Sequence, residues 1–164
     1  MINIHPGFDE SSAILQKEFK GAALRVYDFY DPAKHREISI KRARKKFPPF
    51  PGTERITTSD FPKQNKPADL ICLFLSAHEI RDEAERIQFF IQLKRNLSAE
   101  GQIVLVEHLR NLPNFLAYTL GAFHFHSRST WQHCFDEAGL TIVGEQQFTP
   151  FITIIYLTKN DPSS

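Results

Sequence analysis

Polar and ionisable side chains recur where five short apolar runs of the sequence end. They are His5 and Gly7, Asp28 and Asp31, Asp60, then Ser76, His78 and Glu79, and finally Glu107 and His108. An imidazole can exchange a proton near neutral pH, and a carboxylate accepts hydrogen bonds from hydroxyl groups. If the five runs are strands of one parallel sheet, their carboxyl ends meet at a single edge, where such sheets bind ligands. We therefore expect these groups to form a site.

The segments between these residues predict the elements that would hold them. Short apolar runs predict strands over Ile2–His5, Leu24–Phe29, Arg55–Thr58, Ala68–Leu75 and Gln102–Glu107. Helical spacing predicts helices over Asp9–Phe19, His35–Lys46, Asp82–Asn96 and Thr130–Ala138, the last of them capped by Ser129. Strands that alternate with helices are typical of a parallel sheet covered by helices.

The C-terminal part of the chain departs from this alternation. Thr141–Phe148 and Phe151–Thr158 are two predicted strands joined at Thr149-Pro150. They must be antiparallel, because a parallel crossover needs a dozen residues or more. Pro113–Phe123 lacks a clean period and is expected to be a loop or a short helix. The predicted fold is α/β: a doubly wound, mostly parallel seven-stranded sheet with a C-terminal antiparallel hairpin, in one domain over residues 1–164.

Composition restricts the partners and the compartment. Twenty Lys and Arg against 19 Asp and Glu give a net charge of +1, so no nucleic-acid partner is expected. No apolar run reaches the roughly 18 residues of a membrane span, and the start lacks the features of a secretory signal. Cys72 and Cys134 lack metal-ligand spacing and are expected to be buried free thiols in a reducing compartment. We therefore predict a cytoplasmic protein.

Four segments carry a resemblance to a known family. They are Ala68-Asp69-Leu70-Ile71, the run LSAHEIRD at Leu75–Asp82, the run LSAEGQIVLVE at Leu97–Glu107, and Trp131 through Ala138-Gly139-Leu140. The sequence resembles the class I S-adenosylmethionine-dependent methyltransferases from Ile2 to Lys159. The resemblance implies strand order 3-2-1-4-5-7-6 with an antiparallel seventh strand. It also implies S-adenosyl-L-methionine as cofactor and methyl transfer as the reaction.

The resemblance assigns a role to most of the polar groups. The family's glycine-rich loop falls on His5-Pro6-Gly7-Phe8-Asp9, where Gly7 is the one glycine retained. Asp28, 21 positions after Gly7, would accept hydrogen bonds from the ribose hydroxyls, with Asp31 as second candidate. Asp60 and Phe61 would meet the adenine ring, and Ser76 the methionine end. The cofactor-binding half would then be residues 1–60 and the second half residues 61–164.

The reaction itself needs alignment and, for an oxygen acceptor, a base. Alignment of a nucleophile with the methyl group can supply up to about 7–11 kcal/mol. His78 is the expected base, with Glu79 or His108 as its orienter or substitute. The apolar and aromatic stretch within residues 109–128 predicts a small, apolar or aromatic acceptor. Because no helices precede Ile2, the acceptor side should be covered by Leu112–Phe125, by residues upstream of Met1 or by a partner subunit, as in a homodimer.

Other interpretations remain open. The altered first loop would suit a catalytically inactive binding or scaffold protein of the same fold. The basic run Lys41–Lys46 would suit an RNA methyltransferase, although it is more typical of a solvated helix face. His124 and His126 would share a face on a strand, but no third ligand of suitable spacing accompanies them, so we expect no metal site. Phosphate-loop and Gly-x-Ser-x-Gly motifs are absent from the sequence.

Overall fold

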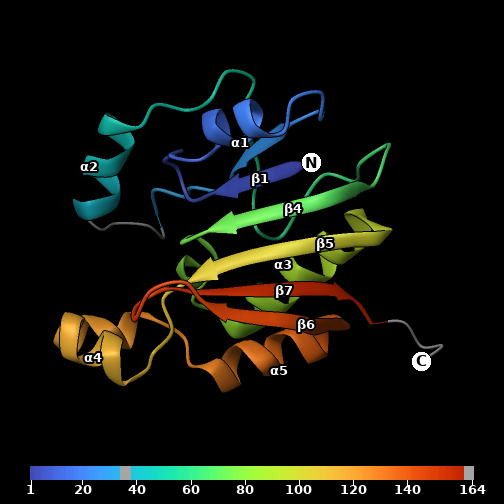
Figure 1. Cartoon of the computed structure of the whole chain (residues 1–164). Helices are drawn as coiled ribbons and strands as arrows, with labels where there is room; N and C mark the ends of the chain where they lie inside the picture. The colour runs from blue at the N-terminus through green and yellow to red at the C-terminus, as the bar shows by residue number, and fades with distance from the viewer. Residues whose placement is uncertain (34–37, 161–164) are drawn as a thin grey trace.

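A single seven-stranded sheet organises the chain (Figure 1). The computed structural model describes residues 1–33 and 38–160. Its strands are β1 (Ile2–His5), β2 (Arg25–Asp28), β3 (Glu54–Arg55), β4 (Ala68–Phe74), β5 (Leu97–Glu107), β6 (Leu140–Gln147) and β7 (Thr153–Lys159). They lie in the order β3-β2-β1-β4-β5-β7-β6. β1 to β5 are parallel, and β7 is antiparallel to both β5 and β6. The predicted fold and strand order are confirmed.

Helices cover the sheet and lie beyond its ends. They are α1 (Ser12–Glu18), α2 (Ile38–Lys46), η1 (Ala77–Glu79), α3 (Glu83–Asn96), α4 (Leu112–Tyr118), η2 (Thr119–His124) and α5 (Arg128–Ala138). Figure 1 shows α3 and α5 on one face of the sheet, whereas α2 and α4 lie beyond the carboxyl ends of the parallel strands. Elements that flank a sheet edge in this way can wall a ligand site.

Aromatic side chains fill the space between α3, α5 and the sheet. The rings of Trp131 and Phe135 stack with centroids 5.6 Å apart, and Phe90 meets Phe135 edge to face at 5.2 Å. All three side chains are fully buried. Trp131 also lies beneath the guanidinium of the buried Arg86, whose Nη1 donates to the carbonyl of Ile80 at 2.9 Å. The core thus fixes the turn that follows β4.

Several predicted boundaries were wrong, among them the start of the first helix, which is Ser12 rather than Asp9. The cap of α5 is Ser127, whose Oγ accepts the amide of Thr130, so the helix begins before Ser129. β5 begins at Leu97 rather than Gln102, and Gly101 lies inside it, where a Cβ would stand 2.8 Å from the carbonyl oxygen of Ala68. β3 is shorter than Arg55–Thr58, because Thr57 turns to form a bridge with Asp60.

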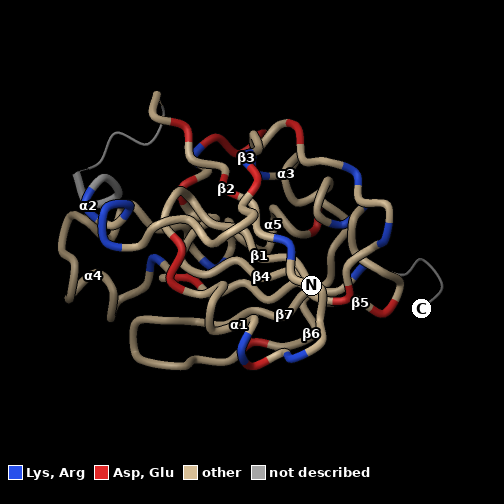
Figure 2. Tube along the Cα trace, turned by 90° about the horizontal axis from the view of Figure 1, so that it is seen from above, with Lys and Arg blue, Asp and Glu red and all other residues tan. Residues whose placement is uncertain are grey.

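Two helical predictions have a more exact outcome. Pro113–Phe123 forms the short helices α4 and η2, the second of the two alternatives. The helix predicted over His35–Lys46 is present from Ile38, and His35 lies outside the described residues. Figure 2 shows the blue of Lys and Arg concentrated along α2. Within 1–33 and 38–160, no helix has both the length and the apolar character needed to cross a membrane.

Candidate active site at the carboxyl edge of the sheet

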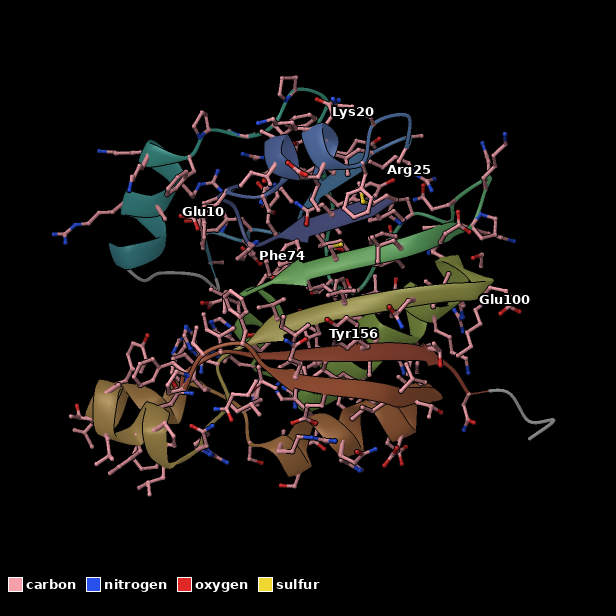
Figure 3. The ribbon with its side chains drawn as sticks, viewed as in Figure 1. Glu10, Lys20, Arg25, Phe74, Glu100 and Tyr156 are labelled. Carbon is pink, nitrogen blue, oxygen red and sulfur yellow. The ribbon has the colours of Figure 1, made fainter. Side chains whose placement is uncertain are left out.

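The strand register brings most of the predicted residues to one edge. His5 pairs with Asp28 at the ends of β1 and β2, and Val106, next to Glu107, pairs with Phe74 at the ends of β5 and β4. In Figure 3, Phe74 marks this edge, while Arg25 and Glu100 lie at the opposite one. The edge therefore gathers ionisable groups that are far apart in the sequence.

The loop that follows β1, His5 to Asp9, is tightly closed. Gly7 has φ +100°, and its amide donates to Nδ1 of His5 at 3.2 Å, so that nitrogen must carry the lone pair. Burial lowers the pKa of His5, an effect that Arg44 reinforces and that Asp28 and Asp9 oppose. The Asp9 carboxylate accepts the amides of Ser11 and Ser12, which starts α1. These contacts explain how the loop folds without the family's other glycines.

Side chains from α2 and the end of β2 cover this loop. A Cβ on Gly7 would lie 2.2 Å from Nη1 of Arg44 and 2.7 Å from Cβ of Tyr30. The Arg44 guanidinium stacks over the Tyr30 ring at 4.0 Å and lies 3.5 Å from Oδ2 of Asp28. Asp28 is only 3% exposed, and its Oδ1 accepts the Tyr30 amide at 2.8 Å. The carboxylate of Asp28 is therefore already occupied.

A cleft of about 640 Å³ opens beside the loop. It is lined by Phe29–Pro32, by Ile56–Ser59 and by Glu79–Asp82 with Glu85. Asp31, not Asp28, is the acid from the end of β2 that lines it, and Asp31 Oδ1 accepts the Ala33 amide at 2.8 Å. The cleft is within the size range of small-ligand sites. It lies where the ends of β2 and β3 and the turn after β4 converge.

The structure places Asp60, Phe61 and Ser76 away from this cleft. Asp60 is exposed, and together with Phe61 it borders a neighbouring depression of about 1060 Å³ along α3, which shares Ser59 and Glu85 with the cleft. Phe61 is core: its ring meets Tyr27 at 4.9 Å, and its amide donates to Gln92. Ser76 is fully buried, with Oγ donating to the carbonyl of Ile4 at 3.4 Å. None of the three presents a side chain to the cleft in this structure.

His78 and Glu107 form a buried charged pair. Nδ1 of His78 lies 2.6 Å from Oε2 of Glu107, while Oε1 of Glu107 accepts the amides of Ser76 and His78 at 3.2 Å. On the other side of the ring, Nε2 lies 3.4 Å from Oε1 of Glu79. Burial opposes the charge, but Glu107 and Glu79 outweigh it and raise the pKa of His78 to about 10. His78 is thus an imidazolium held between two carboxylates.

Glu79 also contacts a histidine from a distant segment. His124, at the end of η2, places Nε2 3.5 Å from Oε1 of Glu79, and the His78 and His124 rings are 5.6 Å apart. Burial raises the pKa of Glu79, but the hydrogen bonds from His124 and His78 lower it by more than burial raises it. The net pKa of Glu79 is therefore below the usual range. Arg81 also contacts the His124 ring and carbonyl.

His126 does not join this group. Its Nε2 lies 3.1 Å from Nη1 of Arg86, and its ring packs against Trp131 at 5.2 Å. Burial and then Arg86 lower the pKa of His126 to about 4. The shared strand face predicted for His124 and His126 was wrong, since η2 ends between them.

His108 stands in an aromatic cluster next to the pair. Its Nδ1 lies 2.8 Å from the carbonyl oxygen of Phe151, which can only accept, so Nδ1 carries a proton and the lone pair of the neutral ring is on Nε2. Tyr118 and Phe125 have ring centroids 5.4 and 4.9 Å from the His108 ring. Phe125 also contacts His78, at 5.8 Å. The cluster links the predicted base to the segment from α4 and η2.

The fold is that of class I methyltransferases. No model of a protein family and no curated protein sequence matches the chain. Among solved structures, a riboflavin-derivative dimethyltransferase (RosA, Streptomyces davawensis) superposes with TM-score 0.68 and 12% identity over 96% of this chain and 48% of its own. The neocarzinostatin O-methyltransferase NcsB1, solved with S-adenosylmethionine and a naphthoic acid, superposes with TM-score 0.67 and 13% identity over 96% of this chain and 48% of its own. An S-adenosylmethionine-dependent methyltransferase from Clostridium acetobutylicum superposes with TM-score 0.66 and 11% identity over 98% of this chain and 83% of its own. The chain spans under half the length of the two larger enzymes.

Proposed function

We propose that this chain binds S-adenosyl-L-methionine at the carboxyl edge of its sheet and transfers the methyl group to a small apolar or aromatic acceptor. The observation that carries the proposal is the cleft between the ends of β2, β3 and η1, which adjoins the buried His78–Glu107 pair in a methyltransferase fold. The cofactor would supply an electrophilic methyl group on a sulfonium. RosA and NcsB1, two proteins whose structures are similar to that of this chain, are small-molecule methyltransferases, which supports the proposal.

The residues present fit the two ends of such a cofactor. Asp31 and the walls Ile56–Ser59 offer the adenosyl part a carboxylate, hydroxyls and an apolar side chain. Around Gly7, three buried polar atoms have no hydrogen-bond partner among the described residues: His5 Nε2 and Asp9 Oδ2, which lie 3.6 Å apart, and Arg44 Nη1, which lies 3.5 Å from Oδ2 of Asp28. The acceptor at Asp9 and the donor at His5 complement the ammonium and carboxylate of an amino acid. Buried polar groups without a hydrogen bond are rare in native proteins, and a ligand at this loop would supply the bonds that these two atoms lack.

His108 is the residue best placed to take a proton from the acceptor. Its tautomer is set by the Phe151 carbonyl, which leaves the Nε2 lone pair available. His78, our expected base, faces a carboxylate with each ring nitrogen and has no lone pair to give in this arrangement. We assign His78 to positioning and charge balance at the edge, with Glu107 as the residue that orients it. The sequence placed Glu107 at the edge without a role.

The acceptor side supports an apolar substrate. Tyr118 and Phe125 line up with His108, and α4 and η2 expose Leu112, Leu116 and Leu120 at 69%, 71% and 78%. Large exposed apolar groups of this kind mark binding surfaces. We propose that the segment within 109–128 forms part of the acceptor wall. A homodimer partner that completes it, and a cytoplasmic location, remain predictions.

A second candidate function is a non-catalytic binding module. Arg44 and Tyr30 fill the space above Gly7, and Asp28 is held by the Tyr30 amide and Arg44. S-adenosylmethionine can extend over the loop only if the Arg44 side chain withdraws. Should it not withdraw, the fold would hold partners without transferring methyl groups.

Calorimetric titration with S-adenosylhomocysteine tests the proposal. We expect saturable binding of one ligand per chain, and at least a tenfold loss of affinity in Thr57→Trp, since the exposed Thr57 lines the cleft. Thr141→Trp is the matched control, because Thr141 is exposed on β6 at the opposite side of the sheet. Absence of binding at millimolar ligand would favour the non-catalytic module. Equal affinities in both variants would remove the cleft from the proposal.

A further inference from the structure

Three side chains beside the cleft have the donor types and spacing of a metal site. His78 and Glu79 come from η1, and His124 comes from the end of η2, 45 positions further along the chain. Their donor atoms all lie within 4.8 Å of one another. Imidazole nitrogen and carboxylate oxygen are the donor set of catalytic zinc sites, in which three protein ligands leave one position open.

The distances match the coordination of a small divalent ion. Ligands bound at about 2.1 Å in a tetrahedron stand about 3.4 Å apart. Oε1 of Glu79 lies 3.4 Å from Nε2 of His78 and 3.5 Å from Nε2 of His124. Two of the three edges of the ligand triangle therefore already have the required length. The third edge, between the two imidazoles, is at most 4.8 Å long and would shorten by a movement of His124, whose side chain is 24% exposed.

Glu107 provides independent support from behind the site. A metal-bound imidazole typically donates its other N–H to a carboxylate, which fixes the tautomer and the direction of the ring. Glu107 makes this contact with Nδ1 of His78 at 2.6 Å, is itself fully buried, and is held by two backbone amides. Nε2 of His78 is thereby aimed at Glu79. The proton on Nε2 of His78 faces the Glu79 carboxylate at 3.4 Å, and a metal ion can take the place of this proton.

The surroundings favour one open coordination position. Phe125 packs against both imidazoles, with centroids 5.8 and 6.3 Å from His78 and His124, and shields one side. Glu79 lines the cleft, so the site borders it. Nη2 of Arg81 contacts both ring nitrogens of His124, including the proposed ligand atom Nε2, and must move aside for a cation. Its exposed side chain can do so, and its charge makes metal binding weaker than it would otherwise be.

We propose that His78, Glu79 and His124 bind a divalent transition-metal ion of the zinc type, with Glu107 as the residue that positions His78. The proposal departs from our sequence expectation of no metal site: His124 would find its co-ligands in the turn after β4 rather than in His126. It does not depend on methyl transfer. If both proposals hold, the open position of the metal faces the cleft and would take an oxygen of the acceptor.

Titration of the chelator-treated, full-length protein with Co²⁺ and Zn²⁺ tests the site. We expect one equivalent of Co²⁺ to produce the intense visible bands of low coordination number, and Zn²⁺ to displace it. His124→Gln should lower the affinity at least 100-fold, and Glu107→Gln about 10- to 100-fold with the stoichiometry unchanged. Arg81→Gln should raise it. Thermal unfolding of each variant verifies that it is folded.

His133→Gln is the matched control, because His133 and Glu83 form an exposed histidine–carboxylate pair with atoms 3.1 Å apart. This variant should bind Co²⁺ like the native chain. Loss of binding in His133→Gln, unchanged binding in folded His124→Gln, or no Co²⁺ bands at millimolar metal would overturn the proposal. Binding of S-adenosylhomocysteine to the metal-free protein is measured separately, so failure of one proposal is distinguishable from failure of the other.

Discussion

The buried pair of His78 and Glu107 predicts a large coupling energy that can be measured without any ligand. Nδ1 and Oε2 are 2.6 Å apart, Glu107 is fully buried, and His78 is 7% exposed. Among the described residues, removal of His78 leaves the Glu107 carboxylate buried with backbone amides alone, and removal of Glu107 leaves Glu79 as the one carboxylate that faces the buried His78. Breaking a buried pair costs about 3–5 kcal/mol. For a chain of this size, about 2–4 °C of melting temperature corresponds to 1 kcal/mol. His78→Gln and Glu107→Gln should therefore each melt about 6–20 °C lower.

The double variant should lose less than the sum of the two single variants, because it buries no unpaired charge. We expect the double-mutant cycle to give a coupling energy of at least about 1.5 kcal/mol. The assay is urea unfolding at pH 7 with a chelator present. It measures the free energy of unfolding of the native chain, both single variants and the double variant.

A matched surface pair provides the control for this cycle. His133 and Glu83 have the same residue types at 3.1 Å, but their side chains are 56% and 57% exposed. Exposed ion pairs couple by about 1 kcal/mol or less. Additivity within about 0.5 kcal/mol at His78 and Glu107, or a coupling no larger than that of the surface pair, would refute the account of a buried, mutually dependent pair.

Three further results are expected. Burial opposes the charge of His78, but Glu107 and Glu79 raise its pKa to about 10. The contribution of the charged ring to the stability of the chain is therefore complete below pH 6.5 and is lost as the pH rises towards 10. The urea midpoint of unfolding should fall over that range, and less steeply in His78→Gln. Gly7→Ala should destabilise the chain by about 1–3 kcal/mol, because Gly7 has φ +100° and a Cβ there would meet Arg44 and Tyr30. Gly52 is the control: it has φ +84°, but a Cβ there meets nothing within 4 Å, so Gly52→Ala should lower the free energy of unfolding by less in the same urea assay. Burial raises the pKa of Cys72 to about 12 and of Cys134 to about 11, so neither thiol should react with Ellman's reagent until the chain unfolds; rapid reaction of the native protein would contradict their burial.

The sheet could be predicted because its signals are local. Continuous apolar runs identify buried parallel strands, and the short link around Thr149-Pro150, which spans residues 148–152 in the structure, forces the antiparallel hairpin. Helix and strand ends were less accessible. Nothing in the run Leu97–Gly101 distinguishes a helix end from a strand start, and the choice is made by pairing of β5 with β4 across a bulge.

The site could be predicted only as a set of residues at one edge. Which acid faces the cleft depends on Arg44, a residue of α2 that reaches across to Asp28 and leaves Asp31 at the cleft wall. The ionisation of His78 depends on Glu107 and Glu79 together, and the position of His124 depends on η2. These are contacts between distant segments, and residue spacing carries no information about them. A charged residue that ends an otherwise apolar buried strand, as Glu107 does, is the one signal that could have indicated the pair.

The most direct test of the account is a co-crystal structure with S-adenosylhomocysteine. We predict adenosine density in the cleft between Phe29–Pro32 and Ile56–Ser59, with the amino-acid end over Gly7 and the Arg44 side chain displaced from its place beside Asp28. Ligand density in the depression beside Asp60, or an empty cleft at saturating ligand with Arg44 unmoved, would contradict the proposal that this edge is a cofactor site.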